Sequence, residues 1–145
     1  MPGWIETGFK EYQKRMPSEC TLRLHVLAPN KKAKNAPLER RLTLEGEGMM
    51  AAIPQGSYVI ALDERGQQWT TKQLAQNLER RLMAGCDLAL LIGGADGLAP
   101  ACKQRADQTW GLSQLTLPHM MVRVVVAEQL YRAWSLLKGH PYHRE

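Results

Sequence analysis

Residues 88–98 read LALLIGGADGL, and this stretch decides the fold class. Residues 88–92 are apolar throughout, which is typical of a short strand in a sheet that is covered on both faces. Residues 93–98 are rich in glycine and lead to Pro100, which suits the first position of a helix. We predict that residues 88–92 form a central strand, and parallel sheets usually bind ligands where such a strand ends in a loop before a helix. We therefore expect a small-molecule site at this point of an α/β sheet.

Helical and strand patterns alternate along the rest of the chain. Apolar spacing and proline positions predict helices at residues 2–16, 37–52, 71–84, from 100, and 120–138. Alternating or continuous apolar residues predict strands at 22–26, 58–62 and 88–92, and a further strand beside the pocket at 112–117. Thr70 followed by Gln73 is a capping-box pattern, and Gly85 suits a left-handed helix end. This order implies one α/β domain, residues 1–145, with a mostly parallel sheet and helices on both faces.

Composition and charge limit the protein class. The 145 residues carry a net charge of +5, and 44% are hydrophobic, as in an ordinary globular protein. No apolar run is long enough for a membrane span, and no secretory signal begins the chain. The three cysteines lie far apart, which favours reduced thiols and a cytoplasmic location. Basic clusters at residues 31–34, 40–41 and 80–81 fit either salt-sensitive nucleic-acid binding or a solvated surface.

Two segments are candidates for function. The glycine-rich loop at residues 93–98 is neither a GxGxxG fingerprint nor a phosphate-binding loop with Gly-Lys-Ser/Thr, so dinucleotide or nucleoside-triphosphate binding is poorly supported. It could hold a ligand through backbone groups, or it could be only a tight turn. The tail at residues 140–145, HPYHRE, is either a disordered terminus or a group of side chains that stack on bases and bind phosphate.

Five motifs, in order, resemble one protein family. They are LIGGADGL at residues 91–98, LTLPH at 115–119, VRV at 122–124, AEQLYRA at 127–133 and PYHR at 141–144. Together they resemble the small bacterial SPOUT methyltransferases, which methylate N3 of a pseudouridine in helix 69 of 23S ribosomal RNA. The resemblance covers essentially the whole chain. It implies S-adenosylmethionine as cofactor, no metal, a trefoil knot in the C-terminal half, a homodimer, and a substrate presented by the assembled ribosome.

The resemblance also implies which residues form the site. Three loops would bind S-adenosylmethionine mainly through backbone groups, and their residues are Leu62, Gly93, Gly94, Leu112, Ser113, Gln114, Leu115, Thr116 and Leu117. The tail would act on the RNA through Tyr142, His143 and Arg144. Because the N3 proton must leave, His143 is the expected base, and Arg144 is expected to stabilise the resulting anion.

One departure and two alternatives accompany this interpretation. Members of the family normally begin with a β-strand before the first helix, whereas this sequence starts at Met1-Pro2-Gly3-Trp4. Either Met1 is a downstream methionine and the strand precedes it, or the sheet has one strand fewer here. One alternative function is a basic RNA- or ribosome-binding protein without catalysis, which would bind RNA but no cofactor. The other is a nucleotide-utilising enzyme with a parallel sheet, against which the missing phosphate-loop lysine counts.

Overall fold

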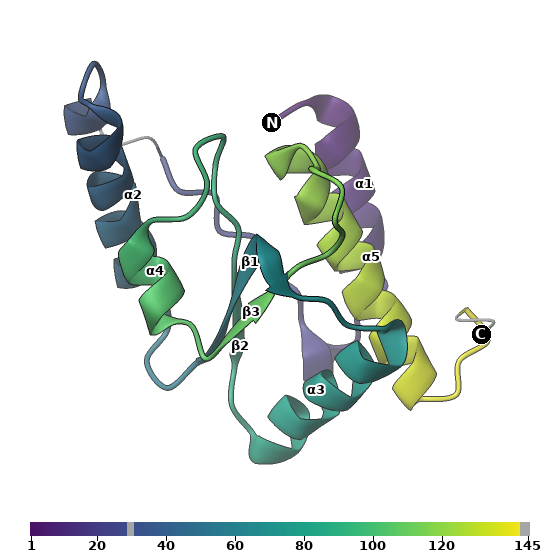
Figure 1. Ribbon diagram of the computed structural model, residues 1–145. Coiled ribbons are helices and arrows are strands. Elements are labelled where there is room, and N and C mark those ends of the chain that lie inside the picture. Colours follow the sequence, from purple (N-terminus) through teal and green to yellow (C-terminus); the bar gives the residue numbers. More distant parts are fainter. Residues whose placement is uncertain (29–30, 143–145) are drawn as a thin grey trace. The chain divides into compact units, whose positions relative to one another are not determined.

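The computed structural model describes residues 1–28 and 31–142 (Figure 1). Its contacts divide the chain into two compact units, each assembled from separate stretches of sequence. The sheet unit contains His25–Gln68 and Cys86–Thr116, and the helical unit contains Met1–Leu24, Trp69–Gly85 and the chain from Leu117 onward. Within the described residues, no helix is long and apolar enough to span a bilayer.

The sheet unit is built on three parallel strands, which confirms the predicted parallel α/β fold. Strands β1 (Tyr58–Gln67), β2 (Leu88–Leu91) and β3 (Gln108–Trp110) lie in the order β2-β1-β3. The prediction that the strand at 88–92 is central was wrong, because β2 lies at one edge of this sheet. The central strand is β1. Its consecutive residues Val59 and Ile60 point to opposite faces of the sheet, and their side chains are only 0% and 1% exposed. The strand that is buried on both faces is therefore β1.

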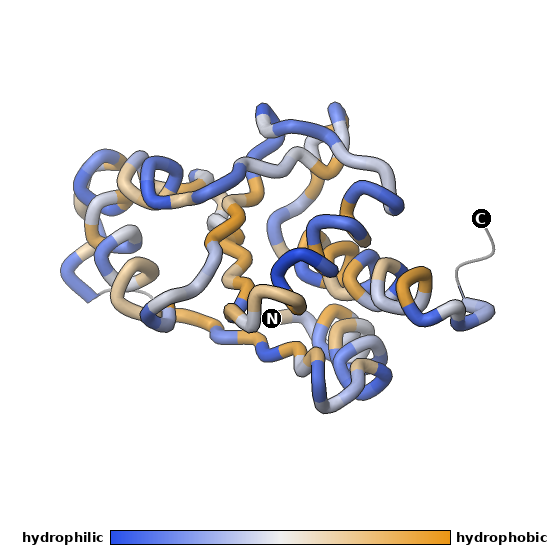
Figure 2. The backbone as a smooth tube through the Cα atoms, turned by 90° about the horizontal axis from the view of Figure 1, so that it is seen from below, coloured by the Kyte–Doolittle hydropathy of each residue, from blue (hydrophilic) through white to orange (hydrophobic). Residues whose placement is uncertain are grey.

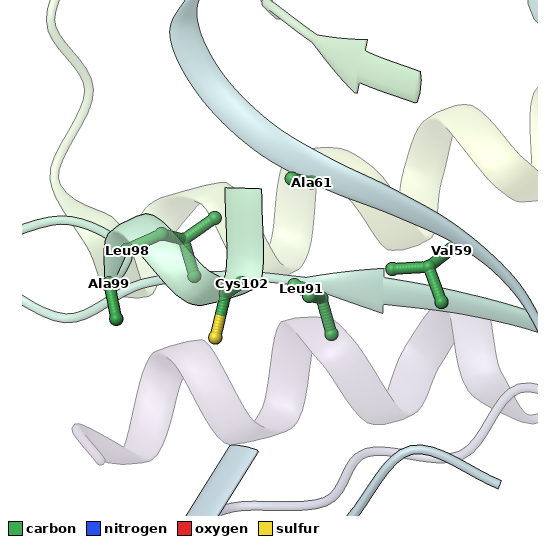
Figure 3. Packing of buried hydrophobic residues seen from close by; sticks show 6 residues of the cluster. All are labelled: Val59, Ala61, Leu91, Leu98, Ala99 and Cys102. Atoms are coloured by element: carbon green, nitrogen blue, oxygen red, sulfur yellow. The ribbon is translucent and has the colours of Figure 1, made fainter. Parts of the chain in front are cut away.

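Two helices and a 3₁₀ turn complete the sheet unit. They are α2 (Leu38–Ala52), α4 (Pro100–Arg105) and η2 (Lys31–Ala33), and α4 contacts both α2 and β1. Both helices lie where they were predicted, although α2 begins at Leu38 and Pro37 occupies the N-cap position before it. Side chains from β1, β2, the end of the glycine-rich loop and α4 form a buried cluster (Figure 3), whose members are Val59, Ala61, Leu91, Leu98, Ala99 and Cys102.

Strand β3 lies earlier in the sequence than expected. The apolar segment at residues 112–117 is not a strand, and the strand is instead Gln108–Trp110. Both Leu62 and Gln67 of β1 pair with Trp110, so residues 63–66 form a bulge between them. Beyond the bulge β1 stays beside β3, because the Gly111 N–H donates to the Gln67 carbonyl oxygen at 3.0 Å, and the chain then continues as a loop.

The helical unit consists of α1 (Gly3–Gln13), α3 (Thr71–Ala84), α5 (His119–Leu137) and the short turn η1 (Ser18–Cys20). Helix α5 packs against both α1 and α3 (Figure 1). The predicted capping box is confirmed, because the Gln73 backbone N–H donates to Thr70 Oγ1 at 3.1 Å and the Thr70 N–H donates to Gln73 Oε1 at 2.9 Å. Gly85 ends α3 with a φ of 70°, also as predicted. Local sequence signals therefore set the ends of α3.

The strand predicted at residues 22–26 is not present. Leu22 and Leu24 are half-buried and Arg23 and His25 are exposed, so the predicted alternation of burial exists, but no described strand pairs with this segment. Val26 is 59% exposed. The first element of the described chain is α1, which starts at Gly3. Figure 2 shows that the helices alternate between hydrophobic and hydrophilic residues.

Candidate functional site

The carboxyl ends of the three strands lie at one edge of the sheet, because all three run parallel. Leu62 is the last residue of β1 before the bulge and pairs with Trp110 of β3. Strand β2 leads into the glycine-rich loop, and β3 leads into residues 111–116. The fold therefore brings three segments predicted to bind the cofactor to the same edge of the sheet unit.

The two adjacent glycines of the loop have different surroundings. A Cβ atom on Gly93 would lie 2.5 Å from the carbonyl carbon of Gly97, so Gly93 allows the loop to fold back on itself. The Gly97 N–H donates to the Gly94 carbonyl oxygen at 3.0 Å, and Gly97 has a φ of 83°, which favours glycine. A Cβ on Gly94 would meet no atom within 4 Å. The loop is thus a tight turn, as the simpler alternative proposed, and it also leaves the Gly94 backbone open to a ligand.

Contacts on both sides hold the glycine-rich loop in place. Leu91 lies before it, Leu98 is its last residue and Ala99 follows it, and all three belong to the buried cluster of the sheet unit. Asp96 in the loop forms an ion pair with Arg41 of α2, in which Oδ2 and Nη2 are 3.6 Å apart. Because both ends of the loop are anchored in a packed core, its backbone groups are held in a defined orientation.

The loop after β3 packs against the bulge of β1. A Cβ on Gly111 would lie 2.7 Å from the Gly66 carbonyl oxygen, so the two backbones approach closely there. Further along, the Leu115 N–H donates to Ser113 Oγ at 3.0 Å, and Thr116 Oγ1 donates to Glu64 Oε2 at 3.2 Å. These bonds fix the loop, and they leave the Leu115 side chain 73% exposed.

The bulge of β1 carries an ionised carboxylate beside this loop. The Asp63 side chain accepts a hydrogen bond from the Arg65 backbone N–H at 3.1 Å and pairs with Lys103 Nζ at 3.2 Å. The backbone hydrogen bond and then the lysine lower the pKa of Asp63 below its ordinary value. Asp63 is therefore a structural anion at neutral pH rather than a proton acceptor.

These segments suit a ligand that is recognised mainly through backbone groups and apolar contacts. The open face of Gly94 lets a ligand approach its peptide groups. Leu115 offers an uncovered apolar surface of the kind that packs on the face of an adenine ring. Both features fit S-adenosylmethionine, whose adenine edge can bond to backbone N–H and C=O groups. The last residue predicted for the pocket, Leu117, belongs to the helical unit.

The predicted tail residues are only partly within the described chain. His143 and Arg144 lie outside the described residues, whereas Tyr142 lies in the helical unit. The Tyr142 hydroxyl donates to Glu128 Oε2 at 3.1 Å, and its oxygen is 3.4 Å from the Tyr12 hydroxyl. Burial, followed by these two neighbours, raises the pKa of Tyr142 above its ordinary value, so its phenol stays protonated.

The partners of Tyr142 were not predicted from the sequence. Glu128 and Arg132 are four residues apart on α5, with Oε2 and Nη2 3.0 Å apart, and this spacing is a recognisable helical ion pair. Tyr12, by contrast, fitted the apolar stripe of α1 and carried no signal for a contact with a residue 130 positions later.

Two comparisons with known proteins bear on the family of this chain. A family model described as "Predicted SPOUT methyltransferase" matches residues 1–143. The chain is also 51% identical over 144 residues to the ribosomal RNA large subunit methyltransferase H of Methylococcus capsulatus, a match that covers 99% of this chain and 93% of the relative. The resemblance seen in the five sequence motifs is thereby confirmed. The chain belongs to the SPOUT methyltransferase family.

Proposed function

We propose that this protein methylates RNA of the large ribosomal subunit with S-adenosylmethionine as methyl donor. The observation that carries the proposal is the meeting of Leu62, the Gly93–Gly94 loop and residues 112–116 at one edge of the sheet, in a member of the SPOUT family. The name of the Methylococcus relative supports ribosomal RNA as the substrate. The net charge of +5 suits a polyanionic partner.

In this proposal the sheet unit binds the cofactor. The backbone of Gly94 and the side chain of Leu115 would contact it, and Ser113 and Thr116 would keep the second loop in shape. When bound, S-adenosylmethionine supplies a sulfonium methyl group that is already a strong electrophile. The protein has chiefly to orient the nucleophile, and such positioning can contribute about 7–11 kcal/mol.

The finer assignments follow the family resemblance. We propose that the target is N3 of a pseudouridine in helix 69 of 23S ribosomal RNA, presented by the assembled ribosome in the cytoplasm. We also propose a homodimer whose C-terminal half forms a trefoil knot. The whole chain would act as one methyltransferase domain, since each compact unit is assembled from several separate stretches of it.

The tail would supply the groups that act on the substrate. His143 would accept the N3 proton, and Arg144 would stabilise the negative charge that develops on the base. Tyr142 would stand next to them, with its own hydroxyl engaged by Glu128. In this proposal the sheet unit binds the cofactor, whereas the tail accepts the proton.

Calorimetric titration followed by a methyl-transfer assay tests the proposal. Purified protein would be titrated with S-adenosylmethionine and, in parallel, with ATP and NAD. We expect saturable binding of S-adenosylmethionine alone, followed by transfer of labelled methyl groups to ribosomes from cells that lack this modification. Ribosome binding by a folded protein that does not bind the cofactor would instead support a non-catalytic RNA-binding protein. Binding of ATP or NAD would support a nucleotide-utilising enzyme.

A further inference from the structure

The residues just before the tail fold back onto α5. Gly139 has a φ of 67°, which reverses the chain at the end of the helix. The His140 backbone N–H then donates to the Ser135 carbonyl oxygen at 2.8 Å, and the Tyr142 N–H donates to His140 Nδ1 at 3.3 Å. A left-handed glycine and two local hydrogen bonds therefore bring Tyr142 back beside the helix.

The ring of Tyr142 lies among aromatic and cationic side chains of α5 and of the turn that follows α1. It meets the Tyr131 ring edge-on, with centroids 4.8 Å apart and planes at 65°. The guanidinium of Arg132 lies 5.0 Å from the centroid of the Tyr142 ring, and that of Arg15 lies 6.0 Å from it. Both separations are within the range of a cation–π interaction. The ring is thus held from several sides.

The hydroxyl of Tyr142 has its own partners, one on each helix. Glu128 of α5 accepts its hydrogen bond at 3.1 Å, and the hydroxyl of Tyr12 on α1 lies 3.4 Å away. Glu128 is itself oriented by Arg132, whose Nε lies 3.1 Å from Oε2 and 3.2 Å from Oε1. A charge-assisted bond to an oriented carboxylate is stronger and more directional than a bond to solvent.

We propose that Glu128, with Tyr12, anchors Tyr142 and so positions the tail that follows it for methyl transfer. The inference rests on the proposed function, in which the tail acts on the RNA. Tyr142 then serves as a positioning residue, because its hydroxyl is engaged by the protein rather than left to the substrate. His143 and Arg144, which the proposed function assigns to the RNA, follow Tyr142 directly in the sequence.

Two variants remove the anchor with little change of shape. Tyr142→Phe deletes only the hydroxyl and keeps the ring contacts, and Glu128→Gln removes the charge that accepts its bond. Glu6→Gln on α1 is the matched control, because Glu6 is an exposed glutamate that pairs four residues away with Lys10 at 2.9 Å. Thermal unfolding would verify that all three variants fold.

Two readouts separate the anchor from the activity. The ¹H–¹⁵N heteronuclear NOE of the Tyr142 amide reports local order, and steady-state methylation of ribosomes gives kcat and KM. We expect the NOE to fall in Tyr142→Phe and Glu128→Gln but not in Glu6→Gln. We expect kcat in both anchor variants to fall roughly 10- to 100-fold, with the Kd for S-adenosylmethionine unchanged.

Each other result has a distinct meaning. An unchanged NOE in both anchor variants would overturn the anchor. A reduced NOE with unchanged kcat would overturn the positioning role. If the wild-type protein binds no S-adenosylmethionine and methylates nothing, the proposed function fails, while the NOE still decides whether Glu128 holds Tyr142.

Discussion

Gly93 and Gly94 are neighbours in the sequence, yet alanine at each position should have opposite effects. A methyl group on Gly93 would lie 2.5 Å from the Gly97 carbonyl carbon and 2.7 Å from its oxygen, so the backbone of the turn must shift. A methyl group on Gly94 would meet nothing within 4 Å. Gly94 also has no positive φ, so alanine fits its backbone conformation. The same chemical change therefore tests packing at one position and ligand access at the other.

The expected magnitudes follow from these surroundings. Forcing a methyl group into closely packed backbone costs about 1–3 kcal/mol, so Gly93→Ala should lower the free energy of unfolding by that amount. Gly94→Ala should leave this free energy unchanged or raise it by about 0.4–1 kcal/mol, because alanine restricts the unfolded chain. If a ligand packs on the open face of Gly94, the added methyl group should weaken S-adenosylmethionine binding about tenfold or more, which is about 1.4 kcal/mol.

Urea unfolding and calorimetric titration of both variants measure these effects separately. Gly94→Ala should show wild-type stability together with weakened binding of S-adenosylmethionine. Normal binding by a stable Gly94→Ala variant would refute the argument that the ligand approaches this backbone. Equal stability of the two variants would refute the argument that Gly93 is required by the turn.

Three further predictions concern other parts of the chain. Thr70→Ala should lower the free energy of unfolding by about 1 kcal/mol in urea, because it removes the side chain that caps α3; an unchanged midpoint would contradict this. The lowered pKa of Asp63 means that its stabilising effect is present above the pKa of the unfolded carboxyl, about 3.9, and is lost as the pH falls through the lower folded value. Asp63→Asn should therefore be less stable than wild type at pH 7, and the difference should shrink below about pH 4; a constant difference at all pH values would count against the ionised pair. His143→Ala should reduce kcat by roughly 10²–10⁴-fold with an unchanged Kd for S-adenosylmethionine, and an equal loss of both would show that His143 is not the base.

Local signals in the sequence were enough to predict most helices. Thr70, Gln73 and Gly85 set the ends of α3 through contacts within a few residues, so no knowledge of the tertiary structure was needed. The five motifs were likewise enough to predict the SPOUT family, which the comparisons confirm. The loops expected at the carboxyl ends of the strands also followed from the alternation of strands and helices.

Strand pairing could not be predicted in the same way. Residues 22–26 have the alternation of a half-buried strand, but a strand also needs a partner, and none of the described strands pairs with them. The segment at 112–117 is apolar enough for a strand, yet the last residue of β3 that pairs with β1 is Trp110. Both errors arose because apolar periodicity reports burial, whereas a β-ladder depends on the position of a second segment.

The sequence by itself determined the α/β class, the positions of the helices, the family and the glycine-rich loop. Only the tertiary structure decided that β1 is the central strand, that Gly93 serves the turn while Gly94 is open, and that Tyr142 meets Glu128 and Tyr12. The physical reason is the distance along the sequence over which each interaction acts. Helix caps, turns and motifs act over a few neighbouring residues, whereas sheet order, close backbone approach and the contact between residues 12 and 142 arise only when distant segments pack together.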